Sequence, residues 1–354
     1  MYADSDLEAA VRHGVLTREA ADGFRDFMAR SRAAPGADEE SFRLLTGFND
    51  IFVTIAIVMV LVAAGTLLGR TSAFAATFFA GPVTACASWG LAEYFTRRRR
   101  MALPSIVLLL FFVGSTIASV MSFENALLPP SPGRGSAAFH GLMASGSLVV
   151  VFAMLAGCFA AYVHWRRFMV PITVAVGALA ASSGILSMLI VSFPELRQFT
   201  PLLIGVAGVI LFGLAMWWDA SDRLRVTRRA DTGFWLHMAA APMIVHPVFT
   251  VFGVFAFAPG VRISSAAAAV GCYLLLALVA LAVDRRAVLV SSLIYVLTAM
   301  SKLLSGAGSE TPAFTVAAFC IGTGLLLLSA LWQRTRARLV LTLPPWLQAH
   351  LPPV

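Results

Sequence analysis

Two histidines and two prolines share one apolar stretch, and among the residues of this chain they are the best suited to bind a ligand. His237, Pro242, His246 and Pro247 lie in the run FWLHMAAAPMIVHPVF. A proline removes a backbone hydrogen bond and kinks a helix. The carbonyl groups freed in this way need partners or line a cavity. Imidazoles and free carbonyls together could bind a polar solute, as broken helices do in many transporters.

The spacing of the two histidines allows a second interpretation. They are nine residues apart, which places them on opposite sides of a straight helix. A shared ligand therefore requires the helix to be interrupted between Met238 and Val248. We expect His246 near mid-depth and His237 nearer the membrane surface. Alternatively, His246 bonds a neighbouring carbonyl or hydroxyl and only fixes packing.

A polar stripe marks another stretch, and its members are Ser291, Tyr295, Thr298 and Lys302. Their spacing of four, three and four keeps them on one helix face. Such a stripe, ending at the single lysine of the chain, could line a path for a substrate. The alternative is that the hydroxyls bond within or between helices and that Lys302 extends its amine to the membrane surface.

Evidence for catalysis is weak. The segment Ala181-Ser182-Ser183-Gly184 resembles the serine motif of rhomboid intramembrane proteases, which would imply His237 as the base. However, alanine stands in place of that family's first glycine, and the glycine-rich spacing around the histidine is absent. No P-loop, dinucleotide fingerprint or zinc-protease helix occurs, and no HxxxH or paired cysteines suggest a metal. We expect no catalytic residue, cofactor or metal.

Composition identifies the class of protein. Hydrophobic residues make up 59% of the 354 residues, charged residues only 12%, and the mean hydropathy is +0.84. Soluble domains carry about 25% charged residues. So much apolar surface must be covered by lipid. The sequence predicts an all-α, polytopic transmembrane bundle.

Apolar stretches of bilayer-spanning length give about ten spans. We divide the chain into an N-terminal segment (1–45), the transmembrane bundle (46–335) and a cytoplasmic or interfacial tail (336–354). The predicted spans are 47–69, 72–95, 102–122, 138–163, 168–192, 199–218, 232–258, 264–283, 287–305 and 312–332.

The basic residues follow the parity of the spans. Fifteen arginines follow even-numbered spans, whereas five basic residues follow odd-numbered ones. The positive-inside rule then predicts that both termini are cytoplasmic. Arginine-for-lysine usage and abundant alanine suggest a bacterial genome, hence the inner membrane. Because the arginines stand in short runs between spans, we expect the lipid bilayer as partner and no nucleic acid.

A repeat is also suggested. Five two-span units end in EYFTRRRR, YVHWRR, WWDASDR, AVDRR and LWQRTR, and transporters are often built from such duplications.

The N-terminal segment reads as a small soluble helical hairpin. Gly14 supplies a stop for the first helix, and Thr17 can cap the second. The run LEAAVRHGVLTREAADGFRDFM resembles the hairpin that opens several uncharacterised bacterial polytopic membrane-protein families. That resemblance implies architecture and no chemistry. The hairpin has too little apolar area for an independent domain. We therefore expect it to dock on a protein partner, on the bundle or on a second copy of the chain.

These observations favour a non-enzymatic function. The first hypothesis is transport or translocation of a small or lipid-like solute, built around the seventh and ninth spans. The alternative is a membrane scaffold or regulatory factor that acts through a protein partner.

Overall fold

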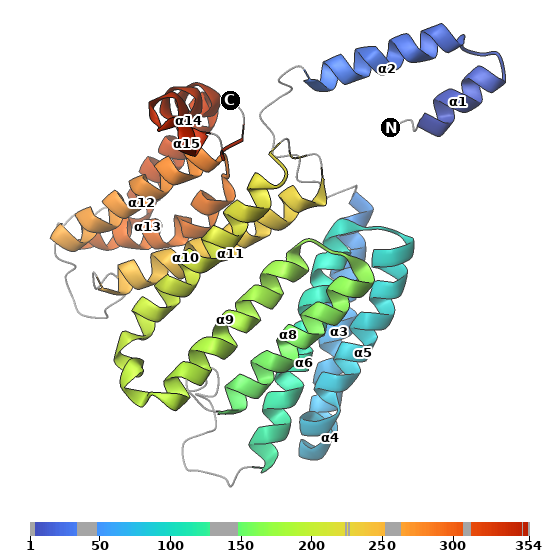
Figure 1. Cartoon of the computed structure of the whole chain (residues 1–354). Coiled ribbons are helices and arrows are strands. Elements are labelled where there is room, and N and C mark those ends of the chain that lie inside the picture. Colours follow the sequence, from blue (N-terminus) through green and yellow to red (C-terminus); the bar gives the residue numbers. More distant parts are fainter. Residues whose placement is uncertain are drawn as a thin grey trace. The chain divides into compact units, whose positions relative to one another are not determined.

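A computed structural model describes residues 4–33, 48–127, 148–223, 225, 227–251, 263–306, 313–348 and 350–352, with some side chains in these ranges excepted. The described residues form helices and turns without any strand (Figure 1). The chain divides into two compact units, residues 1–42 and 43–354. The all-α prediction is therefore confirmed.

The first unit contains helices α1 (Asp4–Arg12) and α2 (Arg18–Ala33). Gly14 follows α1 with a φ of +70°, a left-handed conformation that glycine adopts without strain. Thr17 caps α2, because its hydroxyl accepts the N–H of Ala20 at 3.1 Å. Both predicted helix boundaries are confirmed. The pairing of α1 and α2 as an independent hairpin stays a prediction.

The second unit is built from long apolar helices. Seven described helical segments are long and apolar enough to cross a membrane, and α12 and α13 each contain a shorter apolar stretch. The chain thus has the helices of a membrane protein, and the count of ten remains a prediction. Its elements are α3 (Phe48–Thr71), α4 (Ala73–Phe78), α5 (Ala80–Ala92), the π-helix η1 (Glu93–Arg98), α6 (Ala102–Leu127), α8 (Leu148–Phe168), α9 (Ile172–Ser192), the 3₁₀ helix η2 (Pro194–Phe199), α10 (Thr200–Ala220), α11 (Arg228–Val251), α12 (Ile263–Val283), α13 (Ala287–Gly306), α14 (Ala313–Thr342) and α15 (Pro345–Gln348).

The second predicted span, 72–95, is not one continuous helix. It is divided into α4, α5 and η1, with the break at Phe79. Pro82 explains the break, because a proline ring collides with the carbonyl four residues earlier, which here belongs to Phe78, the last residue of α4.

The seventh predicted span, 232–258, has no such break in its described residues. Helix α11 runs from Arg228 to Val251 with Pro242 and Pro247 inside it. The interruption that a shared histidine ligand would require is therefore not observed. Packing against α10 supports the continuous helix, because Gly208 of α10 lies directly against Met243 and Ile244, the two residues after Pro242.

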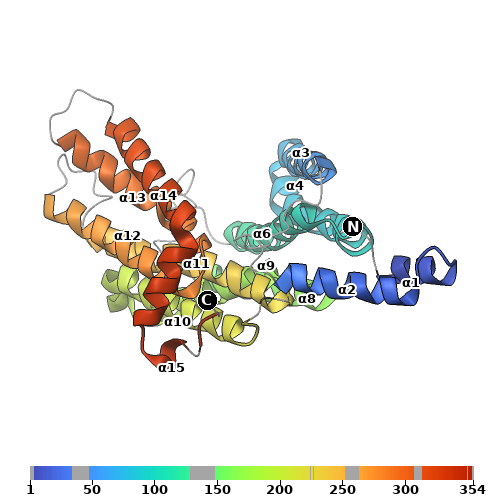
Figure 2. The same cartoon turned by 90° about the horizontal axis from the view of Figure 1, so that it is seen from above.

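Helices next to each other in the sequence pack side by side, notably α8 with α9 and α10 with α11 (Figures 1 and 2). Gly208 allows the close approach of α10 to α11, because a Cβ there would lie 2.9 Å from Met243 and Ile244. Ala175, Ala215 and Leu236 form one buried cluster. This cluster brings the start of α9, the end of α10 and the start of α11 together.

Four connections share an unusual backbone feature. Each follows an even-numbered predicted span and contains a non-glycine residue with a positive φ: Arg100 (55°), Met169 (53°), Arg225 (55°) and Asp284 (58°). The described part of the chain has no other such residue. In the three connections where the structure describes the next residue, that residue is buried, as Met101, Val170 and Arg285. This recurrence favours the two-helix repeat that the sequence suggests.

Candidate functional site

A buried group of charged side chains joins α10, α11 and the connection before α13. Asp219 lies in the last turn of α10. Both of its carboxylate oxygens accept hydrogen bonds from Arg285, at 3.1 Å from Nε and 2.5 Å from Nη2. His237 of α11 lies 3.0 Å from the same carboxylate through its Nε2. The side chains of all three are at most 4% exposed. We call these three residues the Asp219 network.

The backbone around the Asp219 network is shaped to admit it. Gly233 of α11 faces the carboxylate so closely that a Cβ at this position would overlap Asp219. Arg285 also donates to the carbonyl of Ala230, at 3.0 Å. Nδ1 of His237 is buried and has no hydrogen-bond partner among the described residues. An imidazole nitrogen in that position is a place where a water molecule or a polar solute could bind.

A second group of charges adjoins the first. Arg225, in the α10–α11 connection, donates to the carboxylate of Asp284 at 2.9 Å and to the carbonyls of Val283 and Asp284 at 3.1 and 2.9 Å. It therefore satisfies carbonyls that the end of α12 leaves without partners. The indole of Trp332 donates to Asp284 at 2.7 Å. These contacts bind α14 to the same region.

The C-terminal segment binds here too. Arg336 donates to the carbonyl of Pro352 at 2.8 Å, and Arg223 donates twice to the carbonyl of Leu351, at 3.0 and 2.8 Å. Helix α14 continues to Thr342, beyond the predicted boundary at residue 335. Arg336, at the predicted start of the cytoplasmic or interfacial tail, is buried.

The structure separates the two predicted histidines. His237, expected nearer the membrane surface, is completely buried in the Asp219 network, whereas His246 is exposed. The ring of His246 lies 6.0 Å from that of Tyr295, in an edge-on arrangement. Tyr295 and Thr298 of α13 are half-buried. The side chains of Ser291 and Lys302 lie outside the described residues.

Asp219 at the end of α10 and Asp284 just after α12 are both paired with arginines, and Asp219 is buried. Neither Asp219 nor Arg285 was predicted from the sequence as a site residue. A signal existed in the repeat, since the buried positions after Arg100 and Met169 are apolar and the position after Asp284 is an arginine.

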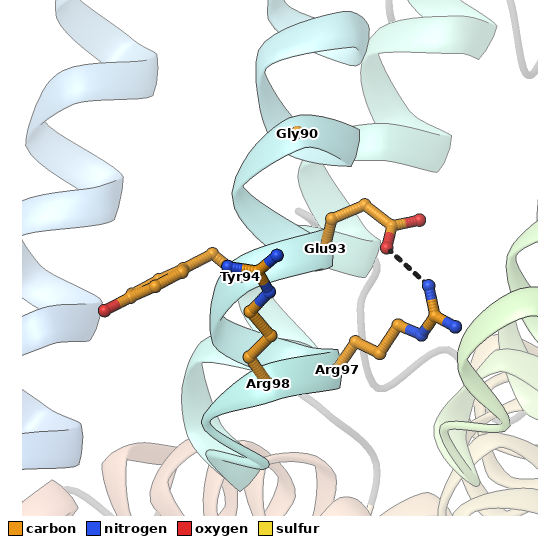
Figure 3. Close-up of a pocket in the computed structure, with 5 residues that line it drawn as sticks. All are labelled: Gly90, Glu93, Tyr94, Arg97 and Arg98. Carbon is orange, nitrogen blue, oxygen red and sulfur yellow. Dashed lines mark hydrogen bonds and ion pairs between the residues drawn. The ribbon is translucent and has the colours of Figure 1, made fainter.

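A separate recess lies beside η1 and is lined by Gly90, Glu93, Tyr94, Arg97 and Arg98 (Figure 3). Its volume is about 500 Å³. Both carboxylate oxygens of Glu93 accept hydrogen bonds from Arg167 of α8, at 2.6 and 3.0 Å. Arg167 and Glu93 thus form a bidentate ion pair that joins α8 to η1.

Comparison of the chain with protein-family models, with curated proteins and with solved structures gives no match.

Proposed function

We propose that this chain moves a small or lipid-like solute across a membrane and that the Asp219 network closes one side of the pathway. The observation that carries the proposal is the complete burial of an aspartate, an arginine and a histidine in a bundle of apolar helices. Ionisable groups inside membrane bundles are costly, and they mark substrate and ion pathways by default.

The Asp219 network can close the pathway and can also open it, because its charged groups are stable either when paired or when in water. Charged groups that lose their partner in a dry site carry a large penalty, but entering water restores their solvation. The end of α10 can therefore separate from Arg285 when water enters between the paired charges. His237 Nδ1, which lacks a partner among the described residues, gives that water a first binding position.

The proposed orientation follows from the arginines. By the positive-inside rule, the arginine-rich connections and both termini face the cytoplasm, and the network lies at the cytoplasmic side of the bundle. The bacterial inner membrane is the proposed location, and the closure is then a cytoplasmic one.

Purified protein in liposomes tests the proposal. One arm measures dithionite quenching of fluorescent phosphatidylglycerol, which reports lipid translocation, and the other measures uptake of radiolabelled glucose, glutamate and choline. We expect activity in one arm and a change of at least several-fold in the Asp219→Asn variant. The matched control is Asp222→Asn, a half-buried aspartate just after α10 whose carboxylate accepts hydrogen bonds from Thr227. Absence of activity in both arms for the native protein would contradict transport of these solute classes.

A regulatory or scaffolding function is the second candidate, and the first unit favours it. Val15, in the connection between α1 and α2, is 76% exposed, and Phe27, on α2, is 60% exposed. Exposed apolar groups that gather in this way mark association surfaces. Self-association through residues 1–42 is the proposed form. Light scattering in detergent should give fewer subunits per oligomer when these residues are deleted. An unchanged number of subunits would exclude self-association through this unit.

A further inference from the structure

The η1 segment carries positive charge that its single carboxylate does not neutralise. Arg97, Arg98, Arg99 and Arg100 follow one another, and Glu93 is already bonded on both oxygens by Arg167. Arg97 reaches Glu93 only at 3.4 Å. Among the described residues, no hydrogen bond or ion pair is found for the Arg98 guanidinium. The region is thus ready to receive an anion.

The local backbone directs these arginines toward the recess. Residues 93–98 form a π-helix, in which the N–H of Arg99 donates to the carbonyl of Tyr94, five residues earlier. Such wide turns are frequently found at functional sites. In Figure 3, Arg97 and Arg98 both extend back along η1 from its last turn, Arg97 toward Glu93 and Arg98 toward Tyr94. The absence of a side chain at Gly90 leaves the recess open.

An apolar stripe leads to this recess. Val83, Cys86, Gly90 and Tyr94 are all exposed. Their spacing of three, four and four residues places them on one face of α5 and η1. In a membrane-spanning element this exposed face lies against acyl chains, and it ends at two arginines. The apolar stripe matches the acyl chain of an anionic phospholipid, and the two arginines match its headgroup.

We propose that the recess at η1 binds the phosphate headgroup of an anionic phospholipid, with an acyl chain lying along the Val83–Gly90 face of α5. Arginine donates several N–H groups to phosphate oxygens in a fixed geometry. Tyr94 closes one side, and its hydroxyl accepts two hydrogen bonds from Arg99, at 3.2 and 3.1 Å. This site is independent of the Asp219 network and of any transport activity.

Native mass spectrometry of the delipidated full-length protein provides the test. Dioleoyl phosphatidylglycerol and dioleoyl phosphatidylcholine are titrated separately, and inorganic phosphate is added as competitor. We expect tighter binding of phosphatidylglycerol, and a loss of about 30-fold in the Arg97→Gln/Arg98→Gln variant, because each arginine contributes about 1 kcal/mol toward an anionic lipid. Arg334→Gln/Arg338→Gln removes the same charge from exposed positions of α14 and should bind as the native protein does.

A second variant fills the recess without changing the charge. No atom lies within 4 Å of a Cβ built at Gly90, so Gly90→Leu should fold and should also lose phosphatidylglycerol. Equal binding of the two lipids would overturn the proposal. So would an equal loss in the α14 control, retention of binding in Gly90→Leu, or full displacement by millimolar inorganic phosphate, which would identify a free-anion site.

Discussion

Arg285 donates to both carboxylate oxygens of Asp219 across a separation of 66 residues. The pair is bidentate, and both side chains are 4% exposed. It joins the last turn of α10 to the residue that stands two positions before α13. Its importance to the fold and its part in the proposed closure can be measured separately.

Loss of one partner should destabilise the protein strongly. We expect Arg285→Gln to lower the free energy of unfolding by about 3–5 kcal/mol, because it leaves the Asp219 carboxylate buried without its cation. Arg167→Gln breaks the exposed pair with Glu93 and should cost about 0–1 kcal/mol. Unfolding in detergent by a denaturant titration gives both values. Similar losses for the two variants would show that the buried pair has no special weight.

The loss of His237 should destabilise the protein more than the loss of His246. His237→Ala leaves an acceptor of Asp219 without its partner, at a cost of about 1–3 kcal/mol. His246 is exposed, so His246→Ala should change the melting temperature little. The two melting curves in the same detergent decide the matter. A larger drop for His246→Ala would mean that the edge-on contact with Tyr295 matters more than the network.

Two glycines provide a matched pair in neighbouring helices. A Cβ at Gly233 would overlap the Asp219 carboxylate, whereas nothing lies within 4 Å of a Cβ at Gly213. We expect Gly233→Ala to cost about 1–3 kcal/mol through overpacking and Gly213→Ala to be neutral or stabilising by up to about 1 kcal/mol. Thermal stability of the two variants is the measurement. A tolerated Gly233→Ala would place Asp219 elsewhere.

Orientation is open to a direct labelling experiment. Cysteines introduced at Ser131 and Gly308 should react with an impermeant maleimide added outside intact cells, because both follow odd-numbered predicted spans. Those introduced at Thr227 and Gln333 should react only after lysis. Reaction of Thr227→Cys from outside would reverse the proposed topology.

Much of the fold could be predicted from hydropathy and charge. The boundaries of α9 and α10 lie within about four residues of the predicted spans 168–192 and 199–218, and the cap at Thr17 follows from its residue type. The break at Phe79 and the continuity of α11 were not predicted. Proline alone does not distinguish them, because the outcome also depends on packing against the neighbouring helix, as at Gly208 beside Met243 and Ile244.

The site was harder to predict because burial is a tertiary property. His237 was identified as a candidate, but its role depends on an aspartate 18 residues earlier and an arginine 48 residues later. Single-helix reasoning treats Asp219 as a solvated helix end. Only the packing of α10 against α11 at Gly233 brings the carboxylate into the interior.

Cysteine accessibility tests the proposed closure most directly. Ala215 lies one turn before Asp219 and is 0% exposed, and Ala153 of α8 is equally buried and lies outside the network. Each is replaced by cysteine in a background that lacks the four native cysteines, and maleimide is applied to the cytoplasmic face of inverted vesicles. We predict that Asp219→Asn raises the labelling rate at position 215 at least tenfold and leaves position 153 unchanged. Unchanged labelling at position 215, or an equal rise at both positions, would contradict a closure held by Asp219.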